Sequence, residues 1–302
     1  MCIAYFRFQP EEEVALFIAA NRDEFHARPT AFAERWHDSH AIIAGRDLEA
    51  GGTWLGMNRQ GGTALITNIR DPLTMRSSAK SRGALVRDAL IHQANQPHHW
   101  FEDEQMASFL ASQGSLEDYN GFNLVFGDTQ KLYYLNNYEL LKQNHKDQFI
   151  TDKRTNTSYQ AHELKAGSYT LSNADLYTVW PKTEELSKSL DAFNLHSIQS
   201  KALADLSSGT VIDFTNEIFE KLADNNQAPD HLLPKTGVSD GFEKLLSSPF
   251  IISPEYGTRC SSIILSFKDG SSFMAERSFN AEGQTTHQVF FYQKAELFLS
   301  SN

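Results

Sequence analysis

Apolar residues fall into short strand-like runs at both ends of the chain and into longer helical runs between them. Residues 2–8 (CIAYFRF) and 14–20 (VALFIAA) are rich in aromatic, β-branched and aliphatic side chains, and a polar turn around Pro10 separates them. The second run is apolar at every position, which is typical of a strand buried on both faces. The two runs predict a hairpin at the start of the chain.

The rest of the chain continues this alternation. Strands are predicted at 42–44, 53–57, 63–67, 122–126, 131–135, 168–171, 261–267, 272–276 and 286–292. Helices are predicted at 81–96, 101–112, 181–193, 196–206 and 211–223. This order fits an α+β fold in which two stacked antiparallel sheets are flanked by helices, a four-layer αββα sandwich. Because no repeat or linker divides the chain, we expect one domain over residues 1–302.

The charge balance argues against two classes of partner. The chain has 27 basic and 38 acidic residues, a formal net charge of −11. An acidic surface repels nucleic-acid phosphates and anionic lipid, so we expect no nucleic-acid partner. No run approaches the roughly 20 apolar residues that cross a bilayer, and Arg7 interrupts the apolar start. We expect no stable membrane insertion and a cytoplasmic protein.

The two cysteines limit the kinds of site that the chain can form. Cys2 and Cys260 are too few for a disulfide scaffold or a structural zinc site, so no metal site is predicted. Removal of Met1 would leave Cys2 with a free α-amine, whose pKa of about 8 lies close to that of a thiol. That amine could act as the base for its own side chain, giving a self-activated nucleophile. A chain that keeps Met1 lacks this base, and the simpler alternative is that Cys2 is a small buried strand residue.

A polar run, Asn21-Arg22-Asp23-Glu24, directly follows the apolar second strand. Buried polar groups are costly unless they are paired, so one interpretation is an ion-pair cluster at the end of the strand. The hairpin register would also bring the run close to Cys2. An arginine and a carboxylate in that position would lower the thiol pKa and orient the amine.

Three further polar residues stand beside predicted strands. Asn68 and Asn173 each follow an apolar strand, and Arg259 precedes one. Asparagine N–H groups suit an oxyanion, and an arginine suits a carboxylate. The alternatives are a turn or cap for each asparagine and a surface position for the arginine.

Short motifs support a more specific interpretation. In chain order they are MCI at 1–3, AANRDEF at 19–25, RP at 28–29, GGTWLG at 51–56, TN at 67–68, YNGFNL at 119–124, LSN at 171–173, YGTR at 256–259 and ERS at 276–278. Together they resemble the NRDE family over essentially the whole chain. More distantly, the site residues resemble those of N-terminal-nucleophile (Ntn) hydrolases of the choloylglycine hydrolase and penicillin V acylase type. The order of the acidic cluster departs from the acylase pattern.

The family resemblance implies the αββα sandwich of the Ntn hydrolases and a cleft around Cys2. It also implies binding and trafficking of haem or a similar apolar anion, with haem acceptor proteins as partners. No C-x-x-C-H motif is present, so haem would be non-covalent cargo and no cofactor is required. Asn21, Glu24 and His26 would then contact the ligand, with His26 or Cys2 as an axial donor.

The acylase resemblance implies the alternative function, a cysteine amidase that cleaves a linear acyl-type amide. In that case Cys2 attacks, and Asn68 and Asn173 steady the oxyanion and the amine. Arg22 and Asp23 would hold the thiolate, and Arg259 would orient it or a substrate carboxylate. Both hypotheses place the catalytic and ligand-binding residues in one cleft.

Overall fold

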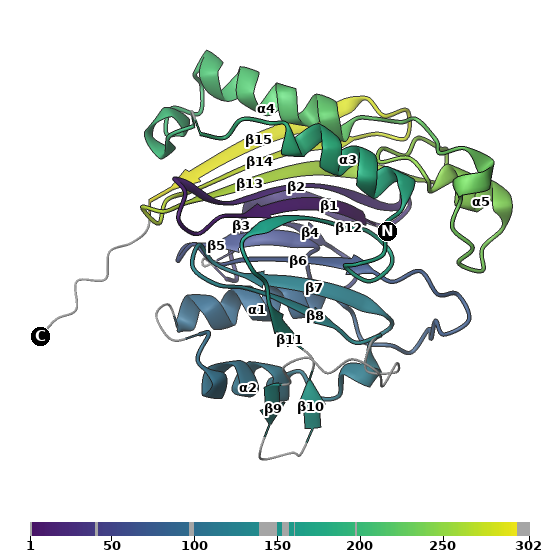
Figure 1. Ribbon diagram of the computed structural model, residues 1–302, viewed down its shortest axis with the longest axis horizontal. Coiled ribbons are helices and arrows are strands. Elements are labelled where there is room, and N and C mark those ends of the chain that lie inside the picture. Colours follow the sequence, from purple (N-terminus) through teal and green to yellow (C-terminus); the bar gives the residue numbers. More distant parts are fainter. Residues whose placement is uncertain are drawn as a thin grey trace, which may run out of the picture.

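The computed structural model describes residues 2–39, 42–96, 100–138, 150–152, 157–159, 161–196 and 198–294. The first sheet has the strand order β12-β1-β2-β13-β14-β15. Its strands are β1 (Cys2–Phe8), β2 (Val14–Phe25), β12 (Gly167–Leu171), β13 (Tyr256–Phe267), β14 (Ser272–Phe279) and β15 (Thr285–Gln293). All its pairings are antiparallel, and helices α3 (Pro181–Asp191) and α4 (Gly209–Leu222) cover its outer face (Figure 1).

The second sheet has the order β11-β8-β7-β6-β5-β4-β3 and is also antiparallel. Its strands are β3 (Thr30–Arg35), β4 (Ile42–Asp47), β5 (Leu55–Asn58), β6 (Thr63–Asn68), β7 (Phe122–Gly127), β8 (Leu132–Asn136) and β11 (Ala161–Glu163). Helices α1 (Gly83–Asn95) and α2 (Asp103–Ser112) pack on its outer face. A separate two-stranded ribbon joins β9 (Ile150–Asp152) and β10 (Thr157–Tyr159).

Three apolar cores separate the four layers. One core lies between the sheets and holds Ile18, Met57 and Ile264, while the other two lie between each sheet and its helices. The predicted four-layer αββα sandwich is therefore confirmed. None of the described helices is long and apolar enough to cross a membrane.

The predicted hairpin of β1 and β2 is also confirmed, with Cys2 opposite Arg22 and Ile3 opposite Asn21. The second strand is longer than its apolar run, because it continues through the polar residues to Phe25. It does so because the first residues of β13 pair with the last residues of β2, placing Thr258 opposite Asp23. The polar run is thus part of a central strand and not a loop that follows one.

The predicted helix over 196–206 is wrong. The described part of this segment contains only a 3₁₀ turn over Ser200–Leu203. The extended backbone of Gln199 ends the 3₁₀ turn on its N-terminal side. On the C-terminal side, Ser207 N donates to Asp205 Oδ1, which replaces a helical hydrogen bond. The strand β3 and the short helix α5 (Asp240–Leu245) were not predicted, because both are short and largely polar.

Candidate functional site

A cavity of about 730 Å³ opens where the start of β1 and the end of β2 meet the segment between β6 and α1. Five of the predicted site residues line it, namely Cys2, Arg22, Asp23, Glu24 and Asn68. Its apolar walls include Phe25, Trp54, Ile66, Ile69, Pro72, Met75, Val238, Phe242 and Tyr256. The cavity is therefore both charged and apolar, as ligand sites commonly are.

Cys2 is fixed at the cavity wall by its strand neighbours. The residue is partly exposed, and its carbonyl oxygen accepts a 3.0 Å hydrogen bond from Ser172 Oγ. Burial raises the pKa of the Cys2 thiol, and the charge of Asp23 raises it further, whereas the Arg22 charge lowers it. A thiolate at this position therefore depends on the cations around it.

Arg22 is 5% exposed and is held on three sides. Its Nη1 donates to Thr30 Oγ1 at 3.0 Å, and its guanidinium lies 4.2 Å from the centre of the Trp54 ring. Its Nη2 is 4.0 Å from Glu24 Oε2 and 3.9 Å from Asp47 Oδ2. The two carboxylates share one cation, so Arg22 presents a largely balanced charge to the cavity.

Asp23 is buried, at 1% exposure, and its Oδ1 accepts a 2.7 Å hydrogen bond from Thr258 Oγ1. Burial raises the pKa of its carboxyl group, and the charges of Lys182 and Arg70 oppose that shift together with the Thr258 hydrogen bond. The groups that favour the ionised carboxylate thus come from three other parts of the chain, and they oppose the effect of burial.

The two predicted oxyanion donors have different surroundings. Asn173 is buried and does not line the cavity, because its Nδ2 donates to the Asn68 carbonyl at 2.9 Å and its Oδ1 accepts from Ser172 Oγ. Its amide joins the ends of β6 and β12. Asn68 does line the cavity, and its side-chain amide makes no hydrogen bond with any described residue. Of the two amides, only that of Asn68 is placed to donate to a ligand.

Asn21 and His26 do not line the cavity. Side chains alternate along β2, so Asn21 points to the helix layer, where its Nδ2 donates to the carbonyls of Leu222 and Pro249. His26 Nε2 lies 3.1 Å from the Ser253 carbonyl oxygen, beyond the end of the strand. Neither position fits the ligand contact that the family resemblance implied.

Arg259 lies outside the large cavity as well. A bulge in β13 between Thr258 and Cys260 redirects its side chain, and its Nη1 donates to the carbonyls of Phe25, His26 and Arg28. It therefore fastens the turn after β2. The predicted single cleft holds five of the nine site residues, and Arg259 is not among them.

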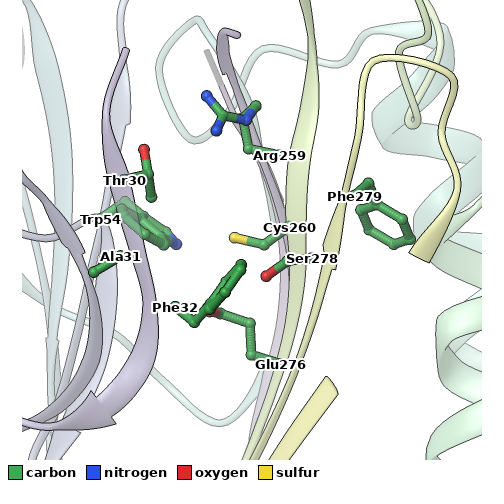
Figure 2. Close-up of a pocket in the computed structure, with 9 residues that line it drawn as sticks. All are labelled: Thr30, Ala31, Phe32, Trp54, Arg259, Cys260, Glu276, Ser278 and Phe279. Atoms are coloured by element: carbon green, nitrogen blue, oxygen red, sulfur yellow. The ribbon is translucent and has the colours of Figure 1, made fainter. Parts of the chain in front are cut away.

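A second, much smaller cavity of about 30 Å³ lies on the other side of Trp54. Figure 2 shows Arg259, Cys260 and Glu276 around it, with the sulfur of Cys260 directed toward Trp54. Burial raises the pKa of the Cys260 thiol well above its ordinary value, and Glu276 adds to that shift. Cys260 is thus an internal strand residue that does not reach the large cavity.

Sequence reasoning missed a buried cluster of charges beside Asp23. Arg70 Nη1 lies 2.6 Å from Glu243 Oε2, and both side chains are almost fully buried. The Arg70 guanidinium also stacks 4.9 Å from the Trp180 ring. Lys182, the second residue of α3, is 3% exposed. One signal pointed to it, since a lysine in the first turn opposes the helix dipole.

Arg82 was also missed, although it lines the cavity just before α1. It is half-buried, its Nη1 donates to the Gly121 carbonyl at 3.0 Å, and no described carboxylate pairs with it. Burial lowers its pKa, and the charges of Cys2 and Glu24 oppose this shift. Further cations on the cavity wall are Arg28, Arg76 and Lys80.

Solved structures with a related arrangement are distant. An N-acylethanolamine-hydrolyzing acid amidase ortholog from Caenorhabditis elegans is 7% identical at a TM-score of 0.33, covering 70% of this chain and 87% of that one. A mutant conjugated bile acid hydrolase from Clostridium perfringens is 9% identical at a TM-score of 0.38, covering 96% of both chains. Likenesses this weak do not bear on activity.

Sequence relatives are much closer. The human Transport and Golgi organization protein 2 homolog is 32% identical over 298 residues, which covers 92% of this chain and 93% of the human protein. The homolog from Mus musculus is 31% identical over 298 residues with the same coverage. A family model described as Transport and Golgi organisation 2 matches residues 1–281. The chain belongs to the Transport and Golgi organisation 2 family.

Proposed function

We propose that the protein binds an amphipathic organic anion, of which haem is one, in the large cavity beside Cys2. The observation that carries this proposal is Arg82, a half-buried guanidinium on the cavity wall with no described carboxylate partner. A ligand carboxylate would supply that partner through a charge-assisted hydrogen bond. The apolar wall residues Trp54, Ile69 and Phe242 would contact the rest of the ligand.

Haem has a suitable size for the cavity, and it combines carboxylates with an apolar body. A cavity of about 730 Å³ lies within the usual range for small-molecule sites. Cys2, Met75 and Tyr256 line it and carry groups that can ligate iron, whereas His26 does not line it. A haem held by carboxylate contacts and apolar walls, with at most one weak axial donor, would be released readily to an acceptor protein.

The experiment is a titration of the purified protein with haemin, followed by the Soret absorption. We expect saturable binding that Arg82→Gln weakens roughly tenfold or more, since a hydrogen bond to a charged group is lost. Arg87→Gln is the matched control, because Arg87 lies on the next helical turn, pairs with Asp88 and does not line the cavity. Binding that does not saturate, or that Arg82→Gln leaves unchanged, would contradict the proposal.

One observation favours a second function, a cysteine amidase. The Cys2 thiol and the Asn68 amide line the same cavity, and the amide has no partner among the described residues. Sγ would add to an amide carbonyl while Asn68 donates to the oxyanion. The amine would then leave with a proton, and water would hydrolyse the thioester to a carboxylic acid.

This candidate is tested by intact mass and by an acyl-amide panel. Loss of one methionine would expose the α-amine of Cys2, and cleavage should then fall strongly in Cys2→Ser with little change in substrate affinity. Cys260→Ser should retain activity, because its thiol lies outside the cavity. Retention of Met1 together with no cleavage of any amide would exclude the self-activated mechanism.

A further inference from the structure

Trp54 is the only described residue that lines both the large cavity beside Cys2 and the small cavity beside Cys260. It is 8% exposed and belongs to the apolar core between the two sheets. Figure 2 shows its ring facing the sulfur of Cys260. The indole of Trp54 is therefore a partition between a cavity of about 730 Å³ and one of about 30 Å³.

Two contacts set the position of this ring. Arg22 Cζ lies 4.2 Å from the ring centre, which is within the range of a cation–π interaction. The far end of the ring packs so closely on Gly45 that a Cβ at that position would lie 2.3 Å from Trp54 Cη2. A larger residue at position 45 would therefore displace the ring. The indole N–H has no hydrogen-bond partner among the described residues, so stacking and packing hold the ring in place.

Trp54 is also fixed relative to Arg82, the proposed partner of a ligand carboxylate. Thr53 N donates to the Gly83 carbonyl at 3.2 Å, which joins the residue before Trp54 to the residue after Arg82. Gly52 permits this close approach, because a Cβ at that position would lie 2.3 Å from the Gly83 carbonyl carbon. These backbone contacts keep the carboxylate partner and the partition at a fixed separation.

Given the proposed binding of an amphipathic anion, we propose that Trp54 limits how far the apolar part of a ligand can extend from its carboxylate at Arg82. A tail that reaches the indole would meet a large ring, and the buried carboxylate of Glu276 and the thiol of Cys260 lie on its other side. A small residue at position 54 would join the two cavities and admit a longer ligand. Trp54 would thus determine the ligand specificity of the large cavity.

The first test needs no ligand and follows the alkylation of Cys260 by N-ethylmaleimide, read by peptide mass spectrometry. Wild-type Cys260 should react slowly, because its thiol is buried beside the partition. Trp54→Ala should raise the rate roughly tenfold or more, since the large cavity then reaches the thiol. Trp54→Phe keeps an aromatic ring and should stay within about twofold of the wild type.

Gly45→Ala displaces the ring without removing it, so it should give a rate between those of the wild type and Trp54→Ala. This variant also carries the test if circular dichroism shows that Trp54→Ala does not fold. A folded Gly45→Ala protein whose Cys260 reacts at the wild-type rate would then count against the partition.

Trp36→Ala is the matched control for a general loss of stability. Trp36 is also a buried indole that stacks on an arginine, with Arg46 Cζ 4.3 Å from its ring centre, but it lines neither cavity. Cys260 should stay protected in this variant even if the free energy of unfolding falls as far as in Trp54→Ala. Equally fast alkylation of Cys260 in both variants would mean that local unfolding exposes the thiol, and would overturn the proposal.

The second test measures the affinity of alkanoates from hexanoate to stearate by isothermal titration calorimetry. Each methylene that the wild type buries should strengthen binding roughly fourfold until the tail reaches Trp54, where the gain should stop. In Trp54→Ala the gain should continue to longer chains. A folded Trp54→Ala protein with the chain-length limit of the wild type would overturn the proposal.

The two tests distinguish this proposal from the proposed function. If the wild type binds no alkanoate and no haemin, the proposed function fails, and the alkylation of Cys260 still decides whether Trp54 separates the two cavities. If the wild type binds these anions but Cys260 stays protected in a folded Trp54→Ala protein, the proposed function stands and the partition is wrong.

Discussion

Thr258 Oγ1 donates a 2.7 Å hydrogen bond to Asp23 Oδ1, joining two motifs that are 235 residues apart. The same hydroxyl oxygen accepts from the backbone N–H of Ile251 at 2.9 Å. One side chain therefore holds both the buried carboxylate of the NRDE motif and the segment that leads into β13.

Thr258→Val should lower the free energy of unfolding by about 2 kcal/mol or more. Valine keeps the shape of threonine but removes the hydrogen bond to a buried carboxylate and the acceptor of the Ile251 N–H. Urea unfolding measures the change. Thr258→Ser retains the hydroxyl and should cost less, so equal losses in the two variants would contradict the role assigned to this hydrogen bond.

The buried pair of Arg70 and Glu243 gives a second prediction. Arg70→Met should cost about 3–5 kcal/mol, because it leaves the Glu243 carboxylate buried without its cation. Adding Glu243→Leu to that variant should recover part of the loss, since no unpaired charge then remains. A double variant less stable than Arg70→Met, measured by urea unfolding, would contradict the explanation that the lone Glu243 carboxylate causes the loss.

Lys182 predicts a pH dependence of stability whose sign is fixed. Its folded-state pKa of about 8 lies below the unfolded value of about 10.4, so the unfolded chain binds more protons between these limits. The free energy of unfolding should rise with pH across this window, by at most about 3 kcal/mol. Lys182→Met lacks this rise and should be the more stable protein at about pH 7, with the advantage fading toward about pH 10.

The control for this titration is Lys188→Met, whose lysine is exposed on the same helix. Its stability should follow that of the wild type across the window. If the free energy of unfolding changed with pH in the same way in the wild type and in Lys182→Met, the buried amine would not be the group that titrates in this window.

A variant of Arg259 can distinguish a structural role from a contact with the ligand. Arg259→Met should lower the free energy of unfolding by about 2 kcal/mol, because hydrogen bonds to three carbonyls are lost. Its affinity for haemin should change less than about twofold, in contrast to Arg82→Gln. A large loss of affinity in Arg259→Met, at unchanged stability, would place this arginine in the ligand site after all.

The layers and the central hairpin could be predicted from the sequence, because the spacing of apolar residues distinguishes strands from helices. The apolar run before Asn21 identifies a central strand, and the period of two then sets Cys2 opposite Arg22. Alternation alone does not place Asn21, because Asp23 lies on the same face of β2 and still lines the cavity. Asn21 is excluded because it lies deeper in the strand, where the carbonyls of Leu222 and Pro249 accept from its amide. Arg259 was misplaced because a bulge shifts the register of β13, and no pattern of apolar residues marks it.

The burial of Arg70 and Lys182 could not be predicted from the sequence for a different reason, although the position of Lys182 in the first turn of a helix is unusual. Arg70 and Lys182 lie next to ordinary loop and helix signals, and their burial depends on Trp180, Glu243 and Asp23, which come from separate elements. Only tertiary packing brings these residues together. Arg82 could not be predicted for the same reason, because only the folded structure shows that no described carboxylate lies beside it on the cavity wall.

The strand β2 is paired on one side with the first strand of the chain and on the other with β13, which begins at Tyr256. During synthesis the NRDE segment is made long before β13, so its second edge stays open until β13 has left the ribosome. The polar end of β2 can be satisfied only then, so the wall of the large cavity is completed after β13 has paired. A nascent chain that stops before β13 should expose an unpaired strand edge, which makes it a substrate for chaperones and prone to aggregation.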